Sequence, residues 1–437
     1  MDVSQSRAAP IPFTKEELEG ARRLRIRLCD TLPEEFDSEF FLARWWRAYK
    51  GDEKALENKL NELIEHRRAF GYNENNIHEK CKNLEFARKT FERFGIAQLN
   101  IDHYSDNVAV FVQRMKNSDL KQITQVIPLS YVCHSYFLLH ECFQKAIRQK
   151  ELETGKPASV AVILDLEGLN LTDFLNPMSN PSKLARLVVK IWSEYFSENM
   201  TRLYLMHPPG ILSIMWQVVK HIADEKTQSS IAFIQKVEDL QNYLDPAAIP
   251  EDLGGTWRDD SGFADPPESC CQKPLPVSAE DYFDRNIWWK SHGFTKKAPE
   301  PKTTTIKNKS IFEITKELKE GEKLCWEFTT NTDLTFDIVR VISKSDTPES
   351  LKENIVISKS DTPESLKENI GHRNGKMEEN DEETLSPKVT LTSLKVPEHG
   401  EIIAKHPGIY KFRWETSGGG WSLISNKLHY IVEICKQ

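Results

Sequence analysis

The hydrophobic pattern of this chain changes period near residue 295, and the change divides the chain into two kinds of fold. Before that point, continuous apolar runs typical of buried strands alternate with patterns typical of helices. The predicted strands are 108–112, 160–166, 202–206 and 230–234, and the predicted helices between them are 130–149, 182–196 and 210–222. This part of the sequence therefore predicts an α/β domain with a mostly parallel sheet.

Residues 14–75 are predicted to form an N-terminal helical subdomain. A first helix is capped by Asp37 or Ser38, and a second helix covers 53–69 and stops at Gly71. The apolar positions that recur at helical spacing are Phe36, Phe40, Phe41, Trp45 and Tyr49. The sheet domain then spans 78–257, and the Pro-containing stretch 258–294 is predicted to be a linker.

Residues 295–437 alternate apolar and polar side chains with period two, which is typical of a sheet that buries one face. The alternation covers 324–328, 334–338, 410–414 and 428–434. This pattern predicts an antiparallel β-sandwich. The three glycines at 418–420 predict a turn or bulge before Trp421.

An exact tandem repeat interrupts the sandwich sequence. Residues 341–355 and 356–370 both read VISKSDTPESLKENI. Only one copy can extend the strand that ends near residue 340, so the other is expected to loop out. The region is acidic and poor in aromatic residues, and we therefore expect a flexible insertion over 344–386.

The formal net charge of −8 argues against a general nucleic-acid binder, because such a protein presents a basic face. The sequence shows no signal-like start and no run of 18 apolar residues, so we expect a cytoplasmic protein that meets intracellular membranes only peripherally. The cysteines show neither CxxC pairs nor zinc-like spacing, and we expect free thiols in a reducing compartment. They are Cys29, Cys81, Cys133, Cys142, Cys270, Cys271, Cys325 and Cys435.

Reactive groups are scarce in this sequence. It contains no GxSxG, GxGxxG, Walker-type or HExxH motif, and His134, His140, His207 and His221 are isolated from one another. Asp165 ends a buried strand, where α/β enzymes place catalytic acids, but no partner motif accompanies it, and a structural hydrogen-bonding role is expected. We therefore expect no enzyme, no metal and no cofactor, and we interpret the apolar segments as walls of a cavity for an apolar ligand.

Five segments, taken in order, resemble the CRAL-TRIO lipid-binding proteins over about residues 30–257, including their N-terminal helical subdomain. These segments are Phe40–Trp45, Ile163–Gly168, Tyr195–Glu198, Tyr204–Pro209 and Ile249–Gly255. Residues from about 295 to 435 resemble a GOLD domain, mainly through Gly408–Phe412 and the strand Leu428–Ile434. The combined architecture resembles the animal phosphatidylinositol-transfer-like proteins that carry both domains in tandem.

The resemblance implies a deep hydrophobic pocket above the sheet, closed by a gating helix at 210–222. An acyl chain gains about 0.8 kcal/mol per buried CH₂ in either a bilayer or an apolar pocket, so exchange between them needs mainly a route. In the gating helix, Met215 belongs to an apolar stripe that Leu212 and Trp216 widen, with Trp216 expected at the membrane–water boundary. The residues expected to contact the lipid are Tyr131, Tyr136, Ile163, Phe174, Glu198, Tyr204, Leu212, Met215, Trp216 and Phe233.

One departure from the family concerns the lipid headgroup. In phosphatidylinositol-binding members, a glutamate at the position of Glu198 cooperates with a lysine, and Ser230 stands at the aligned lysine position here. The ligand is therefore expected to be a phospholipid such as phosphatidylcholine, or a tocopherol-like molecule or retinoid. We expect a protein that binds a lipid and exchanges it at a transient membrane surface. The alternative is a lipid-sensing adaptor in signalling or membrane trafficking, whose GOLD-like domain binds a protein partner.

Overall fold

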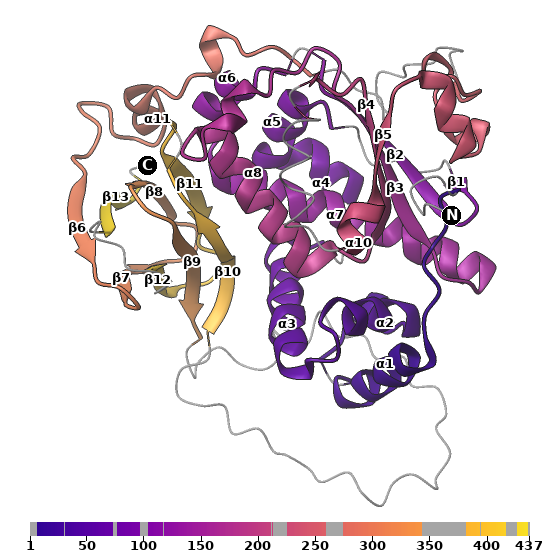
Figure 1. The fold of residues 1–437 in the computed structure, drawn as a ribbon. Helices are drawn as coiled ribbons and strands as arrows, with labels where there is room; N and C mark the ends of the chain where they lie inside the picture. The colour runs from indigo at the N-terminus through magenta and orange to yellow at the C-terminus, as the bar shows by residue number, and fades with distance from the viewer. Residues whose placement is uncertain are drawn as a thin grey trace, which may run out of the picture.

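The computed structural model describes residues 7–29, 31–72, 77–96, 104–116, 118–210, 212, 225–258, 274–342, 382–393, 395–416 and 426–435. Figure 1 shows three layers: an antiparallel β-structure on the left, helices in the centre and a five-stranded sheet on the right. Helices α1 and α2 lie below the central helices in this view.

The predicted start of α2 and the predicted end of α3 are confirmed. Ser38 caps α2 by accepting a hydrogen bond from the Phe41 N–H, and Gly71 ends α3 in the left-handed region at φ 64°. Thr14 and Glu17 form a capping box at the start of α1. The elements of this region are α1 (Lys15–Arg27), η2 (Glu34–Phe36), α2 (Glu39–Ala48), α3 (Glu53–Phe70), α4 (Ile77–Asn83) and α5 (Glu85–Phe94).

The sheet has the strand order β1-β2-β3-β4-β5, in which β2 to β5 are parallel and β1 is an antiparallel edge. Its strands are β1 (Tyr104–Ser105), β2 (Val108–Arg114), β3 (Ser159–Asp165), β4 (Met200–Met206) and β5 (Ile231–Ile234). The prediction of a mostly parallel sheet is confirmed. The continuous apolar runs arise because both faces of β2 and β3 are covered.

Helices connect the strands and cover one face of the sheet. The longest is α7, which starts after Pro128 and ends at Gly155 with φ 65°. Its side chains share one hydrophobic core with the sheet and with α2 and α3. The connecting elements are α6 (Leu120–Val126), α7 (Leu129–Thr154), η3 (Thr172–Leu175), α8 (Asn180–Ile191), the π-helix η4 (Trp192–Phe196) and α10 (Glu225–Ser230).

Short helices follow the sheet. They are η5 (Val237–Asn242), η6 (Pro246–Ala248), η7 (Glu251–Leu253), η8 (Ala279–Asp281) and α11 (Arg285–Ser291). Pro250 and Trp257 form an isolated bridge that closes the α/β domain. Helix α11 lies within the stretch 258–294 that the sequence indicates as a linker, and its Trp289 is fully buried.

Two four-stranded antiparallel sheets form the C-terminal structure, with strand orders β10-β9-β12-β7 and β11-β8-β13-β6. They pack face to face, and the rings of Phe328 and Phe336 from opposite sheets lie 4.8 Å apart. The strands are β6 (Lys302–Ile306), β7 (Ile311–Leu318), β8 (Lys323–Thr330), β9 (Leu334–Val341), β10 (Glu382–Leu391), β11 (Glu398–Ile403), β12 (Gly408–Glu415) and β13 (Asn426–Ile434). Strand β10 starts at Glu382, so the last residues of the expected insertion belong to a strand.

The α/β domain and the β-sandwich share a hydrophobic core. Ile123, Val126, Leu129 and Leu187 from α6, α7 and α8 pack in the same cluster as the sandwich interior. At this junction the buried carboxylate of Glu398 accepts hydrogen bonds from the backbone N–H groups of Leu129, at 2.9 Å, and Ser130, at 3.1 Å. The sandwich therefore caps the first turn of α7.

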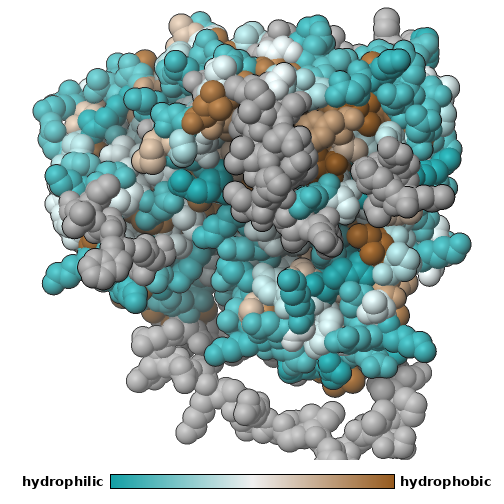
Figure 2. All heavy atoms as spheres, viewed as in Figure 1, coloured by the Kyte–Doolittle hydropathy of each residue, from teal (hydrophilic) through white to brown (hydrophobic). Residues whose placement is uncertain are grey.

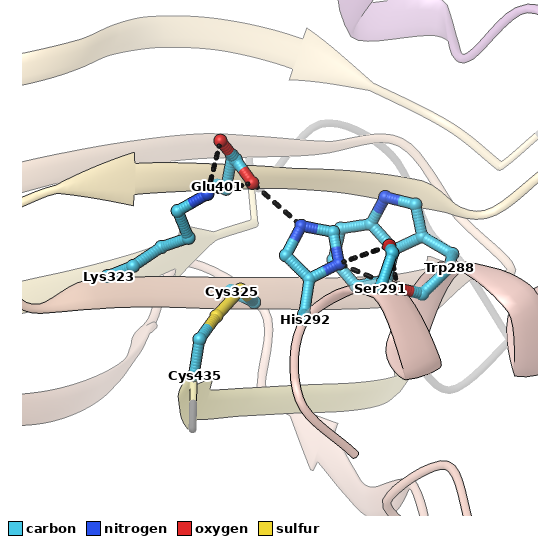
Figure 3. The surroundings of a disulfide bond; sticks show 7 residues. All are labelled: Trp288, Ser291, His292, Lys323, Cys325, Glu401 and Cys435. Carbon is cyan, nitrogen blue, oxygen red and sulfur yellow. Dashed lines mark hydrogen bonds and ion pairs between the residues drawn. A yellow bond between two sulfur atoms is a disulfide. The ribbon is translucent and has the colours of Figure 1, made fainter. Parts of the chain in front are cut away.

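The expectation that all cysteines are free thiols is wrong for two of them. Cys325 in β8 and Cys435, just after β13, form a disulfide with Cα atoms 6.3 Å apart (Figure 3). Strands β8 and β13 pair antiparallel, which brings together two residues 110 positions apart in sequence. Cys29, Cys81, Cys133 and Cys142 are free. The same figure shows Glu401 between Lys323 and His292, beside the disulfide.

Several expectations fall outside the described residues. These are the gating helix at 210–222 apart from residues 210 and 212, with its Met215 and Trp216, the tandem repeat 341–370 apart from residues 341 and 342, the glycines at 418–420, and Cys270 and Cys271. Of the helices that the structure describes, none is both long and apolar enough to cross a bilayer.

Candidate functional site

One face of the sheet carries a grid of apolar side chains from three adjacent strands. Leu164 pairs with Leu205, Leu205 with Phe233, and Leu203 with Ile231. Successive residues of a strand point to opposite faces, so these five side chains lie on the same face. They belong to a single hydrophobic cluster. We call the five residues the sheet floor.

The sheet floor is edged by side chains from the loops at the carboxyl ends of the strands. Leu166, Leu169 and Leu171 are buried at its border, and Phe174 and Leu212 pack against the same cluster as half-buried residues. Of the floor itself, Leu164, Leu203, Ile231 and Phe233 are also only half-buried. In the view of Figure 2, apolar residues gather in the upper half of the molecule beside grey atoms, whereas the surface over the N-terminal helices is mainly hydrophilic.

The structure thus brings together three of the residues expected to contact a lipid: Phe174, Leu212 and Phe233. Two others, Ile163 and Tyr204, point to the opposite face of the sheet, where both are fully buried. The Tyr204 ring lies 5.4 Å from that of Tyr243, and its buried hydroxyl has no hydrogen-bond partner among the described residues. Burial raises the pKa of Tyr204 well above its ordinary value.

The two tyrosines of α7 occupy two further places. Tyr136 packs against Phe196 of η4, and Phe143 of the same helix packs against Phe111 of β2 on the floor side of the sheet. Tyr131 lies at the junction with the sandwich, where its ring is 5.9 Å from that of His399. Burial raises the pKa of both phenols. Neither side chain belongs to the cluster that contains the sheet floor.

Glu198 follows η4, and its nearly buried carboxylate lies 3.8 Å from the guanidinium of Arg47 in α2. Arg47 also forms an ion pair with Glu17 and stacks over the ring of Phe13. Ser230, at the aligned lysine position, ends α10 immediately before β5. A cation from the N-terminal helices therefore lies beside Glu198 in this chain.

A pairing that the sequence analysis missed lies at the carboxyl edge of the sheet. His207 Nδ1 lies 2.8 Å from Asp165 Oδ1, and the same oxygen accepts a hydrogen bond from the Glu167 N–H. His207 has φ 44°, which is unusual for a residue with a side chain. The signal was present, because Asp165 lies at the end of one predicted strand, His207 directly follows another, and the carboxyl ends of parallel strands meet at one edge. The pair confirms a hydrogen-bonding role for Asp165 and joins the ends of β3 and β4.

Side chains that bind metal ions do not cluster in the described part of the chain. Among the described residues, no three His, Cys, Asp or Glu side chains come together as a metal site would require. What the geometry supplies instead is a flat apolar surface of leucine, isoleucine and phenylalanine. Such a surface can bind hydrocarbon by excluding water.

Comparison with known proteins finds a family model that matches the residues of this sheet. Residues 102–255 match the family model of the CRAL/TRIO domain. A CRAL-TRIO domain-containing protein of Caenorhabditis elegans is 28% identical over 329 residues, which cover 74% of this chain and 81% of the relative. The phosphatidylinositol/phosphatidylcholine transfer protein SFH12 of Arabidopsis thaliana is 23% identical over 251 residues, or 55% of this chain and 44% of the relative.

Among solved structures, the crystal structure of Sfh5 aligns with 64% of this chain and 99% of its own, with a TM-score of 0.42 and 17% identity. The chain thus spans most of the nematode relative but less than half of the plant one. The match to the CRAL/TRIO model covers residues 102–255, and the similar proteins include one named as a phosphatidylinositol/phosphatidylcholine transfer protein.

Proposed function

We propose that this protein binds a phospholipid or a similar hydrophobic lipid against the sheet floor and exchanges it between membranes. The observation that carries the proposal is the grid of Leu164, Leu203, Leu205, Ile231 and Phe233 within a CRAL/TRIO domain. Each CH₂ that leaves water for such a surface gains about 0.8 kcal/mol, as it does in a bilayer. Uptake and release are then nearly balanced in free energy, which suits a carrier and requires no chemical step.

The headgroup is the part of the ligand that polar side chains select. Arg47 beside Glu198 supplies a cation near the position where phosphatidylinositol-binding relatives pair glutamate with lysine. We propose phosphatidylcholine or phosphatidylinositol as the phospholipid, in line with the name of the plant homologue. The segment 210–222 remains our proposed gate, with Leu212, Met215 and Trp216 on its lipid side.

Native mass spectrometry of the protein purified from cells tests the carrier function. An intact lipid is expected to co-purify, and the protein is expected to move that lipid between vesicles. Leu203→Trp puts a larger side chain on the floor and should lower lipid occupancy several-fold, whereas Ile409→Trp on the exposed surface of the sandwich should not. The absence of both bound lipid and transfer in the wild-type protein would reject the proposal. A converted lipid in place of an intact one would indicate an enzyme.

A second candidate function, a lipid-sensing adaptor, is supported by the shared core between the sandwich and α6, α7 and α8. We propose that the sandwich is a GOLD-like domain that binds a protein partner. Deleting the sandwich would expose the apolar side chains of that core, so surface substitutions give a cleaner test. Ile311 and Ile409, exposed on β7 and β12, are suitable positions. Loss of a partner from the Ile311→Asp/Ile409→Asp variant in proximity labelling, with lipid transfer retained, would support the adaptor function. Retention of all partners would oppose it.

We propose a cytoplasmic location with peripheral contact to membranes. The disulfide bears on this proposal, because the cytosol keeps most thiols reduced. Acid quenching of cells and alkylation of the denatured protein, followed by mass spectrometry, should find Cys325 and Cys435 largely alkylated if the protein is cytoplasmic. A fully oxidised pair would place the protein in an oxidising compartment instead.

A further inference from the structure

The loop between β3 and α8 presents two large apolar side chains to solvent. Leu175, the last residue of η3, is 61% exposed, and Met178, three residues later, is 71% exposed. An exposed apolar residue is ordinary on its own. Here two exposed apolar side chains lie within four residues of each other and beside an apolar cluster. Such a surface indicates contact with a membrane or with an apolar partner.

Hydrogen bonds hold this loop in its exposed conformation. The Asn170 carboxamide oxygen accepts from the Thr172 N–H at 2.9 Å and from its hydroxyl at 2.7 Å. The Asn176 carboxamide oxygen accepts from the Met178 N–H at 3.0 Å, and the Ser179 N–H donates to the Asn176 carbonyl. Two such turns, one on each side of Leu175, fix the backbone. The apolar tips therefore project from a constrained scaffold.

The same loop is continuous with the sheet floor. Phe174, next to Leu175, packs against the cluster that contains Leu203, Leu205 and Phe233, and Leu171 is buried in that cluster. A hydrocarbon phase in contact with Leu175 and Met178 is thus separated from the floor by one layer of apolar side chains. This position suits a contact at which a lipid enters or leaves.

The charge of the neighbouring helices fits an anionic surface. Helix α8 packs against η3, and α6 packs against α8. Together these two helices carry Lys121, Lys183, Arg186 and Lys190 and not one Asp or Glu, in a chain whose net charge is −8. Arg186 forms an exposed ion pair with Asp333, and Lys190 lies 4.0 Å from Glu194. Lysine and arginine side chains near a bilayer are attracted to its anionic lipids.

We propose that Leu175 and Met178 insert into the interface of an anionic phospholipid membrane, with the basic helices α6 and α8 facing its headgroups. The inference rests on the proposed function, because it assigns the membrane-docking surface of the lipid carrier. Two apolar side chains and a few exposed cations give weak, reversible attachment, which a shuttling carrier needs.

Sedimentation with unilamellar vesicles tests the docking surface in the full-length protein. Vesicles of phosphatidylcholine mixed with phosphatidylserine should bind the wild type more strongly than vesicles of phosphatidylcholine alone, and added salt should weaken the binding. Leu175→Asp/Met178→Asp should lower the partition coefficient at least about tenfold, because it replaces both inserted side chains by charges. The matched control is Leu152→Asp/Ile287→Asp, in which residues that are 73% and 68% exposed on α7 and α11 change in the same way.

The two proposals have separate readouts. If lipid co-purifies with the Leu175→Asp/Met178→Asp variant at the wild-type level, the variant still binds its ligand. The rate at which this variant transfers lipid should then fall together with its binding to vesicles. If this variant sediments like the wild type, or if the control loses binding equally, the loop is not the docking surface, and a protein partner is the better explanation of its exposed side chains. Absence of bound lipid from every variant rejects the carrier function, whatever the vesicle result.

Discussion

Two arginines are buried between the N-terminal helices and α7, and each is matched by a glutamate of α7. Arg44 Nη1 lies 2.6 Å from Glu151 Oε1, and Arg67 Nη2 lies 2.9 Å from Glu141 Oε1. Glu151 Oε1 also accepts a hydrogen bond from the Ala158 N–H. A buried charge without its partner is far more costly than a buried pair, so these contacts fix how the helical subdomain docks on α7.

The Arg44–Glu151 pair gives a prediction at this scale. Glu151→Ala leaves the guanidinium of Arg44 buried without its carboxylate, and the free energy of unfolding should fall by about 3–5 kcal/mol. Arg44→Met/Glu151→Leu removes both charges and should cost clearly less. Chemical denaturation of the three proteins measures the difference. If the double variant is as unstable as Glu151→Ala, the loss is due to packing rather than to the unpaired charge.

Other residue contacts show where sequence reasoning stops. The pattern alone placed Asp165 and His207 near strand ends, and it predicted a hydrogen-bonding role for Asp165, but it did not join the two side chains. Glu198 was predicted from the family, yet its partner Arg47 comes from a helix about 150 residues earlier. The disulfide between Cys325 and Cys435 required the pairing of β8 with β13. Contacts of this kind depend on the arrangement of whole elements, which local periodicity does not encode.

Among the elements, α7 is capped by another part of the chain. Its N-cap residue is Pro128, which makes no side-chain cap, and Glu398 of β11 accepts from the first two N–H groups instead. Glu398→Ala should leave these donors buried and unsatisfied and lower the free energy of unfolding by about 2–4 kcal/mol. Glu398→Gln keeps an acceptor and should lose less. Equal stability of wild type and Glu398→Ala in denaturant titrations would contradict the capping role.

Glu398 also gives the junction a pH dependence. Burial raises the pKa of this carboxyl to about 7, although the hydrogen bonds from Ser130 and Leu129 oppose the rise. The folded protein then holds this proton more tightly than the unfolded chain. The stabilisation is complete below the ordinary pKa, near 4.5, and is lost as the pH rises through about 7. The stability of the wild type relative to Glu398→Gln should therefore fall over this range, and a constant difference would refute the shift.

The disulfide constrains the last strand of the sandwich. It closes a segment of the chain between residues 325 and 435, and Cys325 is fully buried. Cys325→Ala/Cys435→Ala should lower the free energy of unfolding by about 2–5 kcal/mol, because the unfolded chain regains the freedom that the bond removes. Denaturation with and without reductant measures this. Reductant should destabilise the wild type and leave the double variant unchanged; the same shift in both would exclude the disulfide as the cause.

At the scale of the molecule, the sequence predicted the separate layers but not the hydrophobic core that joins the α/β domain to the sandwich. The strand periods gave the parallel sheet and the two antiparallel sheets, because each period follows from which faces are buried. The boundary near residue 295 suggested separate bodies, whereas α6, α7 and α8 pack into the core of the sandwich. A helix that buries one stripe against a sheet and another against a sandwich has the same apolar pattern as an ordinary core helix. The shared core could therefore not be predicted from the sequence.

Four histidines are buried where helices or strands of different parts of the chain pack together. His66 of α3 stacks on Phe137 of α7, His140 of α7 stacks on Phe196 of η4, His134 lies near His66, and His399 is on β11. Burial lowers the pKa of His134 and His140 to about 3 and that of His399 to about 4, and it places the pKa of His66 well below its ordinary value. Each ring is therefore neutral in the folded protein at neutral pH.

These histidines should make the whole molecule sensitive to acid. As the pH falls below about 6.5, the unfolded chain takes up protons that the folded protein excludes, and each histidine removes about 1.4 kcal/mol of stability per pH unit until its folded pKa is reached.

The variant His140→Phe keeps the aromatic contacts with Phe196 and Phe143 but does not titrate. Its stability should therefore fall less steeply with decreasing pH than that of the wild type. His406→Asn, at an exposed position, should leave the slope unchanged. Urea denaturation at several pH values below 6.5 measures the slopes, and a His140→Phe slope equal to that of the wild type would show that His140 is protonated in the folded protein.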